Sequence, residues 1–99
     1  MDMTVKVVLQ QADAIVLLIN DVNTNGASSA YLPSGMSQSE VNNEIQRNVD
    51  HLETVLAYDG SNPTKPDVAG SSADKSSYTA AIVTGKQFLN GLHFFVFHY

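Results

Sequence analysis

The chain has 99 residues, 43% of them hydrophobic, and 10 acidic against 5 basic side chains give a net charge of −5. This length suits one domain, and the hydrophobic content excludes an intrinsically disordered chain. Five dispersed Lys and Arg residues argue against binding to a run of nucleic-acid phosphates. The longest apolar run, Ala14 to Ile19, is too short to span a membrane.

Charge is scarce in this sequence. Only 15% of residues are charged, against about 25% in a typical soluble domain. Ser, Thr, Asn and Gln together supply 29 residues. The chain has no cysteine, so neither a disulfide nor thiolate chemistry is available. A free domain needs a charged surface for solubility, so an uncharged polar surface is easier to understand if other subunits cover much of it.

The first predicted helix spans residues 4–22. Its apolar positions recur at three- and four-residue steps, which indicates one helical face. The alternative is an α+β fold with an N-terminal hairpin, since residues 4–9 and 14–19 are rich in β-branched side chains. The link at residues 10–13 contains no Gly, Pro or Asn, which favours the helix. The apolar face comprises Val5, Val8, Leu9, Ala12, Ile15, Val16, Ile19 and Val22.

A long loop is predicted over residues 23–37, followed by a second helix that ends near Tyr58. Ser37-Gln38-Ser39-Glu40 matches a capping box, in which a serine oxygen and a glutamate carboxylate accept from backbone N–H groups at a helix start. Asp59-Gly60 ends this helix. The stripe that faces the core is Val41, Ile45, Asn48, Leu52 and Val55, with Val49 and Leu56 beside it.

A second long loop covers residues 59–72, and a third helix runs from Ser72 or Ala73 to the Asn90-Gly91 pair. Ala81 and Gly85 on its inner face would let a neighbouring helix approach closely. That face comprises Tyr78, Ala81, Ile82, Gly85, Phe88 and Leu89. The predicted fold is therefore all-α: a three-helix bundle with two long loops, forming a single helical domain over residues 1–91.

Residues 92–99 form a separate aromatic tail, which the sequence predicts to be β-prone and to dock on a partner. No Lys, Arg, Asp or Glu occurs after Lys86, and exposed aromatics at a chain end carry an aggregation risk. The tail either packs on its own core or docks on another chain. Its alternating aromatics suit addition to a partner's sheet edge, and we favour docking. The candidate docking residues are Phe94, Phe95, Phe97 and Tyr99.

One segment resembles a metal loop. Asp21, Asn23 and Asn25 followed by Gly26 fit the first half of a calcium loop. Position 12 would be Leu32 instead of the glutamate that such loops require. The alternative is an Asn-Gly turn at a helix end, and no cofactor is expected.

The second helix also carries a polar stripe, made by Glu44, Arg47 and His51. An acid–base cluster would share some of these features, but ion pairs along a solvated helix face explain the spacing better. The sequence therefore predicts no catalytic residue and no enzyme.

The chain resembles small helical virion proteins of tailed bacteriophages. The similarity covers residues 38–89 and is carried by His51-Leu52-Glu53-Thr54-Val55-Leu56-Ala57-Tyr58-Asp59 and by residues 71–81, in a Cys-free background rich in Ser, Asn and Thr. It implies a non-enzymatic subunit that assembles in many copies on a head, neck or tail. Its partners would be copies of itself or a shell or tail protein, and its location the virion, assembled in the host cytoplasm.

Two alternatives belong to other classes. The chain could be a cytoplasmic adaptor or regulator that binds one partner protein through its C-terminal tail. It could also be a helical calcium-binding module. Oligomeric state separates the adaptor from the assembly subunit, because an adaptor should remain a monomer or a dimer.

Overall fold

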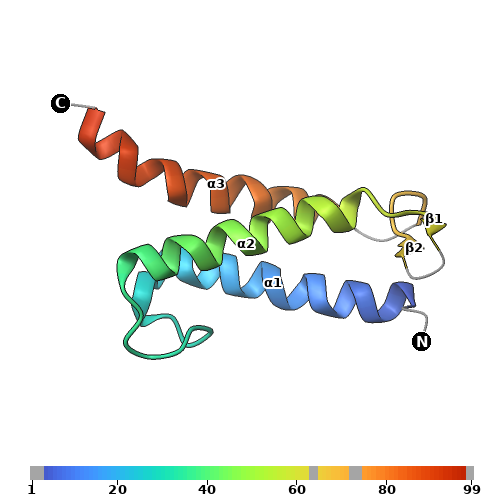
Figure 1. Ribbon diagram of the computed structural model, residues 1–99, viewed down its shortest axis with the longest axis horizontal. Helices are drawn as coiled ribbons and strands as arrows, with labels where there is room; N and C mark the ends of the chain where they lie inside the picture. The colour runs from blue at the N-terminus through green and yellow to red at the C-terminus, as the bar shows by residue number, and fades with distance from the viewer. Residues whose placement is uncertain (1–3, 63–64, 72–74, 98–99) are drawn as a thin grey trace.

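The computed structural model describes residues 4–62, 65–71 and 75–97. It is mostly helical, with three α-helices, one short 3₁₀ helix and a two-stranded sheet. In chain order the elements are α1 (Val5–Asn25), η1 (Gly26–Ser28), α2 (Gln38–Leu56), β1 (Asp59–Asn62), β2 (Lys65–Asp67) and α3 (Ser76–Phe97). The helices lie side by side along an elongated molecule of 47 × 29 × 19 Å, with the hairpin at one end (Figure 1).

Helix α1 begins where the sequence predicts it. The Thr4 hydroxyl oxygen accepts a hydrogen bond from the Val7 amide at 3.2 Å and caps the helix. The helix continues three residues past the predicted end, to Asn25, and stops where Gly26 adopts a φ of 60°. Residues 4–9 and 14–19 are thus parts of a single helix, and the N-terminal hairpin alternative is wrong.

Helix α2 confirms the predicted capping box. The Glu40 amide donates to the Ser37 hydroxyl at 3.2 Å, and the Ser37 amide donates to the Glu40 carboxylate at 2.9 Å. The core-facing stripe of α2 differs from the predicted stripe at one position. Val49 is fully buried, whereas Asn48 is only half-buried and donates to the Glu44 backbone carbonyl at 2.7 Å. A valine adjacent to the predicted asparagine therefore occupies the core.

The connection after α2 contains a hairpin that the sequence analysis missed. Strands β1 and β2 pair antiparallel, with Asp59 opposite Asp67 and an irregular register toward Asn62. Strands this short and polar lack the alternation that predicts a strand. Gly60, with a φ of 79°, lies within β1 where the register is irregular, a position that a glycine accommodates.

Two side chains order the segment between β2 and α3, Val68 by packing in the core and Lys75 by hydrogen bonds within the segment. Val68 is fully buried and belongs to the core. The Lys75 ammonium donates to the backbone carbonyls of Ala69 at 2.8 Å and Ser71 at 2.9 Å. A cation bound to carbonyl oxygens fixes the chain just before α3 begins.

Helix α3 differs from the prediction at both ends. It begins at Ser76, a few residues later than expected, and it runs through Asn90-Gly91 to Phe97. The positive-φ glycines of the described chain are Gly26, Gly35 and Gly60, so Gly91 does not adopt the left-handed conformation that ends a helix. Residues 92–97, predicted to be β-prone, are helical.

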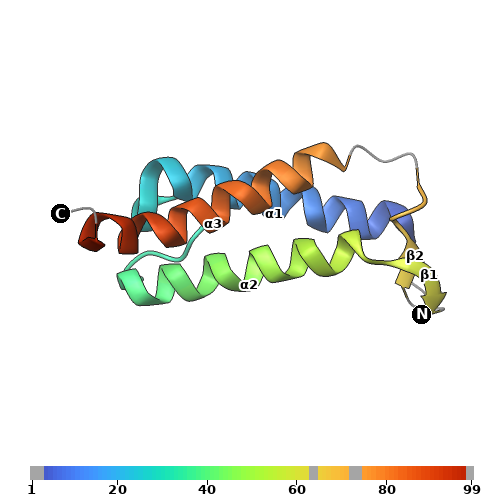
Figure 2. The same cartoon turned by 90° about the horizontal axis from the view of Figure 1, so that it is seen from above.

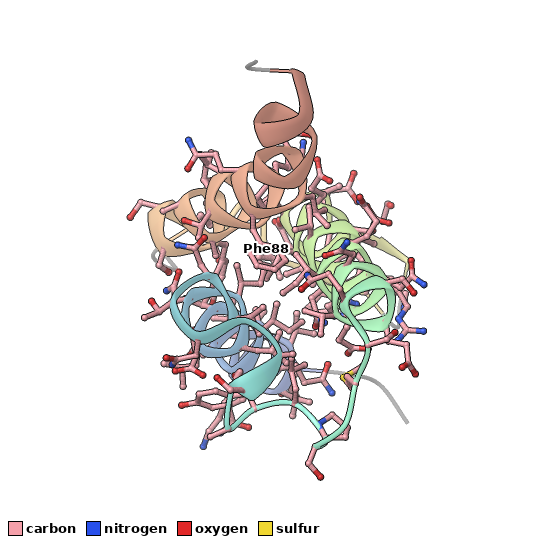
Figure 3. The ribbon with its side chains drawn as sticks, turned by 90° about the vertical axis from the view of Figure 1, so that its left-hand side faces the viewer. Phe88 is labelled. Atoms are coloured by element: carbon pink, nitrogen blue, oxygen red, sulfur yellow. The ribbon has the colours of Figure 1, made fainter. Side chains whose placement is uncertain are left out.

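The three helices share one apolar core. Helices α1 and α3 run in the same direction and α2 runs opposite to both (Figures 1 and 2). Gly85 of α3 is buried against the side chains of Val49, Ile19 and Ile45, which confirms the close approach expected at this position. Phe88 lies between the three helices when the molecule is viewed from the end where α1 and α3 finish (Figure 3).

Candidate functional site

The predicted docking residues fall at the far end of α3. Phe94, Phe95 and Phe97 belong to its last turn, and Tyr99 lies outside the described residues. The end of α3 projects past α2 and diverges from the other two helices (Figures 1 and 3). The segment is therefore presented as the end of a helix and not as a strand suited to a sheet edge. The helix also crosses residue 91, where the sequence analysis placed a domain boundary.

The structure does not bring the three calcium candidates together. Asp21, Asn23 and Asn25 all lie in the last turns of α1, where residues two apart point to opposite sides. The Asn25 amide donates to the Asp21 carboxylate at 3.0 Å, and Asn23 is exposed. In the part of the chain that the structure describes, no three His, Cys, Asp or Glu residues are grouped to hold a metal ion.

A pocket of about 300 Å³ lies beside the end of α1. One carboxylate oxygen of Asp21, Oδ2, is buried and has no hydrogen-bond partner among the described residues. The other oxygen, Oδ1, accepts from Asn25. The pocket is lined by Leu17, Asn20, Asp21, Thr24 and Tyr31.

Tyr31 reaches this pocket from the loop after α1, and no motif in the sequence marks it as a candidate. The Ser29 side chain is buried, and its hydroxyl accepts from the Tyr31 amide at 3.1 Å. The Leu32 amide then donates to the Ser29 carbonyl at 3.2 Å. This tight turn folds the loop back over the end of α1. The sequence shows Tyr31 only as a single aromatic residue in a polar loop. Its position beside α1 depends on the turn at Ser29, which no local pattern predicts.

The polar stripe on α2 forms hydrogen bonds within its own helix. The Arg47 guanidinium pairs with the Glu44 carboxylate, and this contact is the largest cause of the lowered pKa of Glu44. The Asn48 amide donates to the same carboxylate at 3.2 Å. Arg47 is 73% exposed, and His51 is also exposed, as the interpretation of a solvated helix face requires.

Comparison with family models, with curated proteins and with solved structures finds no match to this chain. Among the described residues, none of the helices combines the length and apolar character that crossing a membrane requires.

Proposed function

We propose that the chain is a non-enzymatic assembly subunit of a larger particle, a virion component of a tailed bacteriophage. In this proposal a three-helix bundle presents the C-terminal end of α3 to other protein subunits, which are copies of itself or a shell or tail protein. One observation carries it. A helix end whose last turn reads Phe-Phe-Val-Phe projects beyond the other two helices (Figure 1).

Physical reasoning connects this end to docking. Moving aromatic side chains out of water lowers the free energy, and the end of α3 lies away from the other two helices (Figure 1). The sequence has no Lys, Arg, Asp or Glu after Lys86, so charge does not keep this end soluble. A partner surface would cover it and form the hydrophobic centre of an interface.

The exposed apolar residues elsewhere provide a control. Val83 lies on α3 and is 49% exposed, and Val7 of α1 is 40% exposed. Isolated residues of this kind are normal on protein surfaces. Placing a charge at Val83 should therefore leave assembly intact, whereas a charge in the last turn of α3 should abolish it.

The test measures oligomeric state by size-exclusion chromatography with light scattering. The full chain should form multimers, and Phe94→Asp with Phe97→Asp should be monomeric with an unchanged melting temperature. Val83→Asp should assemble like the parent. Removing residues 92–99 should give the same monomer while the rest of the helical circular dichroism is retained.

Two results would contradict the proposal. Normal assembly of the truncated chain would show that this end is not the docking element. A parent chain that is monomeric or dimeric at high concentration would instead favour the adaptor that binds a single partner.

A further inference from the structure

Asn25 and Gly26 form an Asn-Gly pair at the boundary between α1 and η1. An asparagine followed by glycine is chemically labile, because the glycine nitrogen has no side chain beside it and its backbone rotates freely. Asn25 is exposed to solvent, and a Cβ atom built at Gly26 would have nothing within 4 Å. Water therefore reaches this pair, and no neighbouring atom crowds the glycine.

The reaction open to such a pair is deamidation. The Gly26 nitrogen loses its proton to solvent and attacks Asn25 Cγ, so that a C–N bond forms. The Cγ–Nδ2 bond then breaks, and the released amide nitrogen takes up a proton and leaves as ammonia. Water opens the resulting five-membered succinimide ring at either carbonyl and yields aspartate or isoaspartate. Water is the only co-reactant.

The folded structure holds the peptide unit between these two residues in a conformation that cannot react. Asn25 has a φ of −111° and a ψ of −8°, and this helical ψ turns the Gly26 nitrogen out of the plane of the ring that must form. The Gly26 N–H donates to the Val22 carbonyl, and the Asn25 carbonyl accepts from the Ser28 hydroxyl at 2.7 Å. The peptide unit cannot rotate until both hydrogen bonds break.

The side-chain amide of Asn25 is held as well. Its Nδ2 donates to Asp21 Oδ1 at 3.0 Å, one helical turn back along α1. Deamidation removes this donor and puts a second carboxylate one turn from Asp21. Like charges at this spacing destabilise a helix. The reaction would therefore weaken the last turn of α1 permanently.

We propose that Asn25 is a deamidation site that the last turn of α1 keeps closed. The reaction proceeds only from the fraction of molecules in which this turn is open, as hydrogen exchange does for amides at a helix end. The modification thus records the time that the end of α1 spends open.

A second Asn-Gly pair, Asn90-Gly91, provides an internal comparison. Asn90 is exposed, as Asn25 is, so solvent access does not distinguish the two sites. Asn90 lies inside α3, which continues to Phe97, so helical turns hold the pair from both sides. We expect Asn25 to react before Asn90 in the folded chain.

The test incubates the full chain at mildly alkaline pH in water enriched in heavy oxygen, both folded and in guanidinium chloride. Proteolytic digestion and mass spectrometry then measure each site. In guanidinium chloride Asn25 and Asn90 should react at comparable rates, since glycine follows both, and each should incorporate solvent oxygen. In the folded chain Asn25 should react at least about tenfold more slowly than in guanidinium chloride, and Asn90 more slowly still.

Two variants test the hydrogen bonds directly. Ser28→Ala removes one of the two bonds to the peptide unit and should speed the reaction of Asn25 in the folded chain about fivefold. Thr54→Ala is the matched control, because the Thr54 hydroxyl donates to the Asp50 carbonyl at 2.9 Å on α2. Its loss should leave the rate at Asn25 unchanged. Circular dichroism checks that both variants remain helical.

The inference fails if Asn25 reacts as fast in the folded chain as in guanidinium chloride, or if Asn90 reacts first in the folded chain. It also fails if Ser28→Ala and Thr54→Ala change the rate equally, or if Asn25 stays unmodified in guanidinium chloride or in folded Ser28→Ala. The reaction needs no partner subunit. Its failure is therefore separate from that of the assembly proposal, which oligomeric state decides.

Discussion

Gly85 of α3 lies in contact with side chains of both other helices, and Gly85→Ala tests this packing. A Cβ atom built at Gly85 would meet Val49 Cγ2 well inside 3.0 Å, whereas its distances to Ile19 and Ile45 would be an ordinary 3.6 Å. Val49 is fully buried, and as a β-branched residue in a helix it strongly prefers one rotamer. Its methyl group therefore cannot move aside freely.

Two opposing effects set the magnitude. Alanine is better than glycine in a helix interior by about 0.8–1 kcal/mol, whereas overpacking a core costs about 1–3 kcal/mol. The depth of the clash with Val49 places the cost in the upper part of that range. We expect Gly85→Ala to lower the free energy of unfolding by about 1–2 kcal/mol, and the melting temperature by about 5–15 °C.

Gly91 is a matched control on the same helix. A Cβ atom built there has nothing within 4 Å, and Gly91 does not adopt a positive φ. Gly91→Ala should therefore be neutral or stabilising by up to about 1 kcal/mol. Thermal and urea unfolding followed by circular dichroism measure both variants. Opposite signs at the two glycines would separate the steric clash from helix propensity.

A double-mutant cycle identifies the clashing methyl group. Val49→Ala alone should cost about 2 kcal/mol, because it removes buried methyl groups and leaves a cavity. In the Gly85→Ala background the new methyl group fills part of that space. The loss of unfolding free energy in the double variant should therefore be about 1 kcal/mol smaller than the sum of the losses in the two single variants. A Gly85→Ala chain as stable as the parent, together with additive effects, would refute the reasoning.

Two further predictions concern hydrogen bonds. The hydrogen bond from the Ser37 backbone lowers the folded-state pKa of Glu40 below its ordinary 4.5, so the Glu40 carboxylate stabilises the fold above that value and the effect is lost as pH falls through the lowered pKa. The difference in urea stability between the parent and Glu40→Gln should therefore close in acid. A difference that persists in acid would contradict this prediction. The hydroxyl of Tyr78, a residue that is 3% exposed, donates to the Asp13 carboxylate at 2.9 Å. Tyr78→Phe should lower the free energy of unfolding by about 1 kcal/mol in the same assay, and no loss would show that the bond contributes nothing.

Local patterns in the sequence predicted the helices well. The capping box at Ser37 and the apolar periodicity of α1 depend on residues only a few positions apart, and both are confirmed. The choice between Asn48 and Val49 was settled by tertiary packing, because both positions lie near the core-facing side of α2. The bond from Tyr78 to Asp13 joins residues 65 positions apart, which no local pattern reveals.

The candidate sites show where local patterns mislead. Aromatic and β-branched residues favoured a strand after Gly91, but propensity of this kind is weak and depends on context. The spacing of Asp21, Asn23 and Asn25 suggested a calcium loop, whereas the helix continues through them and places Asn23 on another side. Gly26 is the residue that ends the helix, and the Asn-Gly turn was the better interpretation of this segment.

The direction of α3 relative to α1 decides where the proposed docking end lies. The connections after α1 and after α2 are long enough to permit either orientation, so the sequence could not place the end of α3 beside the end of α1. In the structure α2 runs opposite to both neighbours, so α1 and α3 finish at the same end of the molecule (Figure 2). A subunit that covers the aromatic end of α3 would thus lie at the end of the molecule where α1 also finishes. Under the proposed function, this apolar contact would supply the affinity of the interface.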